Sequence, residues 1–254
     1  MANYYFVTTM LPSLRIGSPP EIESRELDFM LKLNLSHADL AKVTILRRLV
    51  DIENIRRLWQ REPLDPGGNF DATELEEHLV LYEVFPPYVS SFMEKYTTTQ
   101  KRLDHFPMLL HAFFQHECAK ASGFIKTYLT FEREWRLVLV TLRAKYLQRD
   151  PVQALSYEDP DDPFIQQILD QKDAKEFEPP TFYKPLQLLY NTKMNEPLEL
   201  YQGIQEWRFE YIGDMVDGHM FNVDRILGYV LRLDICEKWL LLDKKKGFAL
   251  VEHL

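Results

Sequence analysis

Two histidines and a glutamate in the segment LLHAFFQHEC have side chains that could bind a metal ion: His111, His116 and Glu117. A zinc-binding helix of the HExxH type places two histidines four residues apart on one face, with the glutamate between them. Here the histidines are five residues apart, which turns them about 140° from each other around a helix, and Glu117 follows both. The spacing predicts polar side chains on a partly exposed helix and no metal. A metal-dependent hydrolase centred on these three residues is the alternative.

A loop rich in glycine and aspartate, DPGGNFDATELE, contains oxygen ligands of the kind that bind calcium. They fall at positions 1, 5, 7 and 12 of the segment and are Asp65, Asn69, Asp71 and Glu76. However, position 3 is Gly67, which offers no side-chain oxygen, and position 6, where a calcium loop needs glycine, is Phe70. We therefore predict a loop followed by a helix cap, without calcium.

Five arginines between Arg47 and Arg61 could contact nucleic acid if they shared one helix face. Two of them instead have a carboxylate four residues away, in the pairs Arg47–Asp51 and Glu53–Arg57, a spacing that favours ion pairs along a helix. The net charge of −9 also argues against nucleic-acid binding by charge alone. The pattern predicts a solvated, self-paired helix face, with a protein-docking face as the alternative.

The sequence contains no GxxxxGK[ST], GxGxxG or GxSxG segment, so it carries none of the common phosphate-binding loops and no nucleophile elbow. None of the segments above supplies a nucleophile, a base or metal ligands at a workable spacing. We therefore predict that the protein is not an enzyme and needs no cofactor.

The elements that must position these residues are predicted to be helices. Only 9 glycines occur in 254 residues, fewer than the tight turns of a β-sandwich usually need, and hydrophobic residues make up 46% of the chain. Caps and apolar spacing predict about nine or ten helices, preceded by a short extended segment over residues 3–14. They start near Glu26, after Ser36, at Thr73, at Tyr88, at Pro107 with a break near Ser122–Gly123, after Asp162, near Leu186, near Leu198 and after Asn222. The fold class is all-α, a bundle with long helices.

The length fits one helical domain over residues 1–254, and the alternative is a division into lobes. The lobes would be an N-terminal one at 1–105, long central helices at 106–155, and a C-terminal one at 156–254. Cys118 and Cys236 have no CxxC neighbour, which is typical of buried thiols in a reducing compartment. No signal peptide or membrane-length apolar run is visible, so we expect a cytoplasmic protein that reaches a membrane only through a partner.

The last predicted helix runs from Asn222 to a stop at Gly247 and is apolar on more than one face. One stripe contains Ile226, Tyr229, Leu233, Cys236 and Leu240, and a second contains Leu227, Leu231, Ile235 and Leu242. Such a helix is normally buried in a larger helical body, and Leu233 is expected in its core. Asp224, Arg232, Asp234, Glu237 and Lys238 lie in the same stretch, and Asp234 can pair with Lys238 one turn later.

This helix resembles the end of the C/d-type central-stalk proteins of V-type and A-type ATPases, which carry the letter d in eukaryotes. The residues that match are Phe221, Asp224, Ile226, Leu227, Tyr229, Asp234, Glu237, the run from Trp239 to Leu242, and Lys246 with Gly247. Cys236 departs from the family, which has an acidic residue near this point, and the chain is shorter than the members of that family. The start, NYYFVTTMLPSL, resembles an uncharacterised family found in bacteria that carry V-type ATPases.

The resemblance implies a non-catalytic adaptor of the central stalk that couples the rotor stalk to the membrane ring of a proton- or sodium-transporting ATPase. The implied partners are the other central-stalk proteins and the proteolipid ring, at the cytoplasmic face of the membrane complex. Asp224, Tyr229, Asp234 and Glu237 are the implied docking residues, and the two last carboxylates are expected to add little to stability. An unrelated helical adaptor and the metal-dependent hydrolase are the alternatives.

Overall fold

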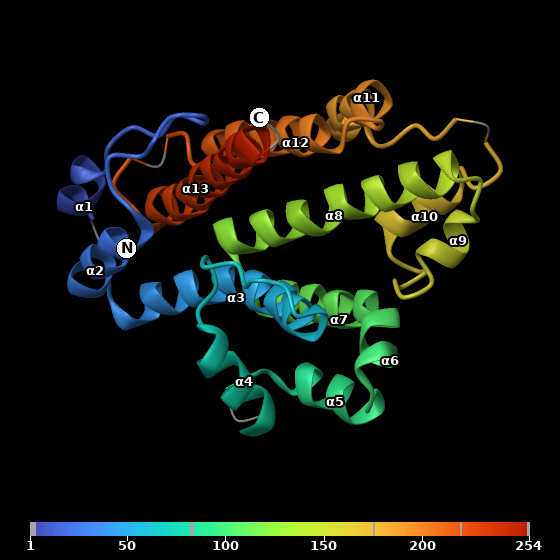
Figure 1. The fold of residues 1–254 in the computed structure, drawn as a ribbon, viewed down its shortest axis with the longest axis horizontal. Coiled ribbons are helices and arrows are strands. Elements are labelled where there is room, and N and C mark those ends of the chain that lie inside the picture. Colours follow the sequence, from blue (N-terminus) through green and yellow to red (C-terminus); the bar gives the residue numbers. More distant parts are fainter. Residues whose placement is uncertain (1–3, 82–83, 175, 219, 253–254) are drawn as a thin grey trace. The chain divides into compact units, whose positions relative to one another are not determined.

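The computed structural model describes residues 4–81, 84–174, 176–218 and 220–252. In these residues it contains thirteen α-helices, one short 3-10 helix and no β-strand (Figure 1). The prediction of an all-α fold is therefore confirmed. The helix predicted at Tyr88 is α5 (Pro87–Lys95). The helices outnumber the nine or ten expected because short helices of four to six residues form as well, namely α1 (Tyr5–Met10), α6 (Thr99–Asp104) and α9 (Pro151–Ala154).

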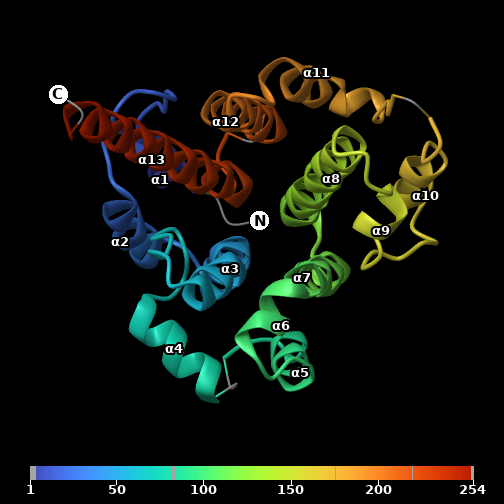
Figure 2. The same ribbon diagram turned by 45° about the vertical axis from the view of Figure 1, so that its right-hand side comes forward.

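The chain divides into two compact units. Unit 1 combines residues Met1–Thr44 with Asn195–Leu254, and unit 2 is the continuous stretch Ile45–Met194. The two ends of the chain thus belong to one unit (Figure 2). This grouping differs from the lobes considered above, which were consecutive along the sequence, because the first helices pack on the last ones.

Unit 1 is built around a helical hairpin. Its helices are α1 (Tyr5–Met10), α2 (Ser24–Asn34), the first turns of α3 (His37–Gln60), α12 (Pro197–Met215) and α13 (Val223–Glu252). α12 and α13 form the hairpin, and both α1 and α2 contact α13. The buried residues of α13 include Ile226, Leu227 and Leu233, in agreement with the predicted core stripe.

Gly228 allows the two helices of the hairpin to approach each other closely. A Cβ atom at this position would lie 2.7 Å from Cγ1 of Val216, which follows the end of α12. Because valine is stiff at χ1, it has little room to move away. The absence of a side chain at Gly228 therefore permits the hairpin to close as it does.

Two predictions about the ends of the chain were wrong. Residues 5–10 form the helix α1 instead of an extended segment, with Val7 buried and the hydroxyl of Thr9 donating to the carbonyl of Tyr5 at 2.9 Å. Packing on α2 and α13 outweighs the weak β-propensity of this segment. The other error concerns Gly247, where the last helix does not stop, because α13 continues to Glu252.

The start of α3 is fixed by a polar cluster inside unit 1. The hydroxyl of Ser36 accepts the backbone N–H of Asp39 at 3.2 Å, which confirms the predicted cap. Asp39 in turn accepts hydrogen bonds from Tyr4 at 2.5 Å and Lys42 at 2.7 Å. Burial works against the charged form of Asp39, but the hydrogen bonds from Lys42, Tyr4 and Ser36 outweigh it and hold the pKa of its carboxyl below the ordinary value. The cluster ties the residue before α1 to α3.

Unit 2 is centred on α8 (Gly123–Tyr146), a helix of 24 residues that contacts α7, α9, α10 and α11. The other elements are the rest of α3, α4 (Ala72–Leu81), α5, α6, α7 (Phe106–Lys120), α9, α10 (Pro163–Leu169), a 3-10 helix at Thr181–Tyr183 and α11 (Lys184–Lys193). The break predicted near Gly123 is confirmed, and so is the cap by Asp162, which accepts the N–H of Phe164 at 2.8 Å. No helix in the described ranges is both long and apolar enough to span a membrane.

Candidate functional site

The four docking residues implied by the resemblance lie on different sides of α13. Relative to Asp224, the ideal helical positions of Tyr229, Asp234 and Glu237 are turned by about 140°, 280° and 220°. Asp224 is half-buried in the first turn of the helix, where a carboxylate is favoured by the helix dipole. Asp234 pairs with Lys238 at 2.7 Å, as predicted. The structure therefore separates these residues instead of gathering them into one patch.

Glu237 has a partner that the sequence pattern did not predict. Its carboxylate accepts the backbone N–H of Ser24 at 2.8 Å and the hydroxyl of the same residue at 2.6 Å. Ser24 is the first residue of α2, so a carboxylate of α13 satisfies one of the free donors at the start of another helix. The expectation that Glu237 adds little to stability is revised accordingly.

We expect the substitution Glu237→Gln to destabilise unit 1 by about 1 kcal/mol, because it removes charge-assisted hydrogen bonds at a helix N-terminus. The matched substitution Asp234→Asn breaks an i,i+4 pair and is expected to cost about 0.3–0.5 kcal/mol. Urea unfolding of both variants, followed by circular dichroism, measures the difference. Equal and negligible effects would show that the contact with Ser24 does not stabilise the protein.

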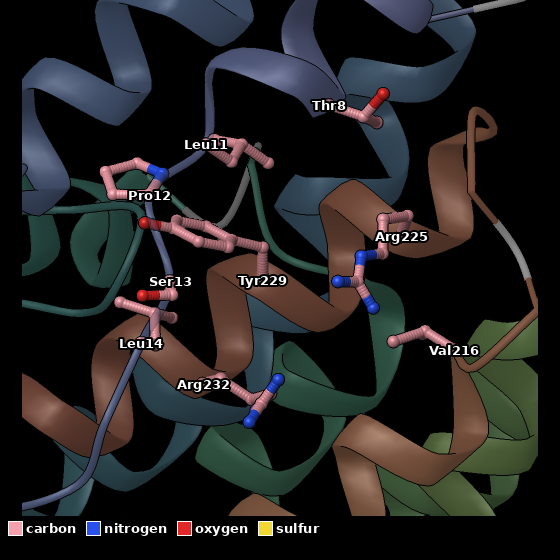
Figure 3. A pocket seen from close by; sticks show the side chains of 9 residues that line it. All are labelled: Thr8, Leu11, Pro12, Ser13, Leu14, Val216, Arg225, Tyr229 and Arg232. Carbon is pink, nitrogen blue, oxygen red and sulfur yellow. The ribbon is translucent and has the colours of Figure 1, made fainter.

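Tyr229, the remaining docking residue, lies in a pocket within unit 1 (Figure 3). The pocket has a volume of about 250 Å³ and is formed by α1 and the segment that follows it, one face of α13 and the residue after α12. Its lining residues are Thr8, Leu11, Pro12, Ser13, Leu14, Val216, Arg225, Tyr229 and Arg232. It combines an apolar wall with two arginines and three hydroxyl groups.

The basic face of this pocket comes from a single stripe of α13. Arg225, Tyr229 and Arg232 follow one another at spacings of four and three residues, so they share one side of the helix. The Arg232 guanidinium lies 3.9 Å from the centre of the Phe209 ring on α12, a cation–π contact that holds it in place. In the sequence Arg232 stood out only as one of several charges, although the spacing of the stripe was visible.

Two polar atoms in this pocket are buried without a hydrogen-bond partner among the described residues: the Tyr229 hydroxyl and Nε of Arg232. Burial, and next the positive charge of Arg225, lower the pKa of the Arg232 guanidinium, while Asp214 acts in the opposite direction. Burial is also the main reason that the pKa of Tyr229 rises to about 12. Buried donors of this kind normally have a hydrogen-bond partner, so the lack of one among the described residues calls for an explanation.

In unit 2, His116 lies beside Glu117, whereas His111 has a different carboxylate as its partner. The Glu117 carboxylate is almost fully buried and lies 2.8 Å from Nη1 of Arg48, with Nδ1 of His116 at 3.3 Å. Nδ1 of His111 lies 3.2 Å from Glu158. In the described ranges no three histidine, cysteine or acidic side chains are placed to hold a metal ion. The expectation of a metal-free protein stays a prediction, which metal analysis of protein purified without added metal can check.

Two carboxylates of α3 have partners that the sequence did not predict, and one of these partners lies in the glycine-rich loop. Asp51 accepts the backbone N–H and the side-chain amide of Asn69 at 2.7 and 2.6 Å, so α3 holds the loop that was considered for calcium. Burial raises the pKa of the Asp51 carboxyl although the Asn69 hydrogen bonds act against this rise. Glu53 pairs with Arg136 of α8 at 2.6 Å. The carboxylates of α3 therefore connect segments of unit 2, a role that their i,i+4 spacing did not predict.

Comparison with known proteins identifies relatives along the whole chain. A family model described as "Protein of unknown function (DUF2764)" matches residues 1–254. An uncharacterized protein of Chlamydia muridarum is 28% identical over 236 residues, which cover 91% of this chain and 89% of the relative. An uncharacterized protein of Chlamydia pneumoniae is 26% identical over 260 residues, which cover 100% of this chain and 98% of the relative. No solved structure matches the chain.

Proposed function

The chain belongs to the DUF2764 family over its full length, and from this premise we propose that it is a non-catalytic adaptor of a V-type ATPase, similar to the C/d-type central-stalk proteins. In this role it joins the central stalk to the proteolipid ring at the cytoplasmic face of the membrane complex. The proposal rests on the resemblance of the last helix to proteins of that assembly, and of the first residues to a family found in bacteria that carry V-type ATPases. Neither the family description nor the relatives' descriptions name a function.

The observation that best supports the proposal is that the two resembling segments lie together in unit 1. The backbone N–H of Tyr4 donates to the carbonyl of Phe221 at 2.9 Å, and the rings of Tyr5 and Phe221 are 4.9 Å apart. More than two hundred residues separate these segments in the sequence, yet α1 contacts α13. The two segments therefore lie side by side in unit 1, where a single partner can contact both.

The helices α1 and α2, which contact each other, carry exposed apolar side chains suited to docking. On α1, Phe6 and Met10 are one turn apart and are 63% and 54% exposed, and Tyr5 beside them is also exposed. On α2, Phe29 and Leu33 are likewise one turn apart and exposed. Several large apolar side chains exposed on two helices of one unit are typical of a protein-interaction surface, where aromatic anchors contribute most of the binding energy.

The proposal is tested by a pull-down from detergent-solubilised membranes of the source organism with the full-length tagged protein. We expect V-type ATPase proteins to be enriched with the unaltered protein. The double substitution Phe6→Ala/Met10→Ala is expected to weaken this enrichment at least about tenfold, because interface anchors commonly contribute 2 kcal/mol or more each. The matched control is Leu188→Ala on α11 of unit 2, a side chain that is 66% exposed.

Each outcome of this experiment separates the proposal from an alternative. Capture of other proteins without any part of the ATPase contradicts the proposal and favours an unrelated helical adaptor. An equal loss of binding in the Leu188→Ala control contradicts the docking surface on α1. Stoichiometric metal in the purified protein, together with hydrolytic activity that His116→Ala abolishes, would favour the hydrolase.

A further inference from the structure

The pocket of unit 1 differs from a cavity in unit 2 in one respect: the arginines of the unit 1 pocket are not paired with carboxylates. A cavity of similar volume, about 240 Å³, is lined in unit 2 by Arg133. That arginine donates to the carboxylates of Glu158 and Asp162, the latter at 2.8 Å. Neither Arg225 nor Arg232 makes such an ion pair with any carboxylate of the described residues. Of these two cavities, the one in unit 1 therefore lacks a paired counter-charge from the described part of the chain.

We propose that this pocket is a binding site for a dianionic phosphate group, either as inorganic phosphate or as the phosphate of a small phosphomonoester. Arg225 and Arg232 supply two positive charges from one face of α13, whereas the Tyr229 hydroxyl points to the other side of the pocket, toward Pro12. In Figure 3 the guanidinium groups of both arginines extend from α13 to the same side, beside Val216. The inference does not depend on the adaptor role.

The number and kind of donors select a phosphate over a carboxylate. A guanidinium forms bidentate hydrogen bonds with either group, but two guanidinium charges balance a dianion and not a single carboxylate. Ser13 adds a hydroxyl group to the same lining, whereas the Thr8 hydroxyl already donates to the backbone carbonyl of Tyr4 at 3.0 Å. A tetrahedral phosphate offers enough oxygens to engage both guanidinium groups at once, including Nε of Arg232, which is buried without a partner among the described residues.

The dimensions of the pocket favour a small ligand. Its volume of about 250 Å³ is below the 300–1,000 Å³ that is usual for drug-sized ligands. Val216 lies on the side of the arginines, and Leu11 and Leu14 add apolar lining from the segment after α1, which suits a short organic group attached to the phosphate. The burial that lowers the pKa of Arg232 also strengthens its attraction to an anion, since charges interact more strongly away from water.

Isothermal titration calorimetry of the full-length protein at low ionic strength tests the site, with inorganic phosphate, methyl phosphate and acetate as separate probes. We expect saturable binding of one phosphate per chain, and weaker or absent binding of acetate. Tighter binding of methyl phosphate than of inorganic phosphate would assign the site to phosphomonoesters, and the reverse order would assign it to free phosphate.

Variants locate the site. Arg232→Gln and Arg225→Gln are each expected to weaken phosphate binding at least about tenfold, because each removes donors to a charged acceptor. Arg25→Gln, at an exposed position of α2, is the matched control and should bind as the unaltered protein does. Because Arg232 also packs on Phe209, the exposed Arg225 keeps the test informative if the Arg232 variant folds poorly.

Three results would overturn the inference. The first is the absence of saturable binding of either phosphate probe up to millimolar concentration. The second is binding that persists unchanged in both arginine variants, which would place the phosphate elsewhere. Acetate binding as tight as phosphate binding would reject the assignment to a dianion.

Discussion

Replacing Leu233 by alanine is expected to reduce the free energy of unfolding by about 2–5 kcal/mol, which is a large part of the stability of an ordinary domain. The side chain of Leu233 is 0% exposed and lies in the middle of α13, the longest helix of unit 1. Its truncation removes buried methyl groups and leaves a cavity that the hairpin of α12 and α13 cannot fill without moving. Urea unfolding followed by circular dichroism measures the change.

Leu241 provides a control on the same helix. It is the same residue type and is 47% exposed, so Leu241→Ala leaves no cavity and is expected to change stability by about 0.5 kcal/mol or less. Because alanine is at least as good a helix former as leucine, helix propensity does not confound the comparison. Similar losses in both variants would mean that burial of Leu233 is not what holds α13 in place.

The second large effect is expected for Glu117→Ala in unit 2, at about 3–5 kcal/mol. Glu117 is 4% exposed and its carboxylate lies 2.8 Å from Nη1 of Arg48, with the Tyr88 hydroxyl donating to it at 3.4 Å. Removing the carboxylate leaves the positive charge of Arg48 largely buried without its partner, and that charge can no longer reach full hydration.

The test compares three variants by urea unfolding. Glu94→Ala, at an exposed position of α5, is the control and should change stability by about 0.5 kcal/mol or less. The double substitution Arg48→Met/Glu117→Leu should recover most of the loss, because apolar residues of similar size often replace a buried pair without cost. A double variant as unstable as Glu117→Ala would show that the loss comes from packing and not from the unpaired charge.

The losses of stability expected for the Leu233 and Glu117 variants matter for the proposed function because they would make each unit less rigid. An adaptor that transmits rotation needs helices whose packed cores resist deformation. Leu233 lies in the hairpin that α1 packs against and that carries the arginines of the pocket. Loss of this core would therefore disturb docking and phosphate binding together, whereas the surface substitutions in α1 and the pocket should separate them.

Local features of the sequence were sufficient for most of the secondary structure. Ser36 and Asp162 cap helices through side-chain bonds to amides two or three residues away, so the signal and its effect lie in the same short segment. The break before Gly123 is local as well, since this glycine adopts a φ of +57° that other residues rarely adopt. The burial of Leu233 followed from its place in the apolar stripe.

Only the tertiary structure decided how the polar residues are used. The ionic partner of Glu53 was predicted four residues away on the same helix and is found on α8. Packing of two helices brings together charges that are far apart in the sequence. Glu237 contacts a residue 213 positions earlier in the chain, which no local pattern could reveal. Residues 5–10 became a helix for the same reason, since their contacts with α2 and α13 outweigh their own propensity.

The pocket of unit 1 combines both sources of information. The spacing of Arg225, Tyr229 and Arg232 was set by the sequence and places them on one side of any helix. That their charges and hydroxyl lie in a cavity without a carboxylate partner among the described residues depends on where the segment after α1 and the end of α12 are folded. Helix geometry is set by neighbouring residues, whereas the burial and pairing of a charge are set by segments far apart in the chain.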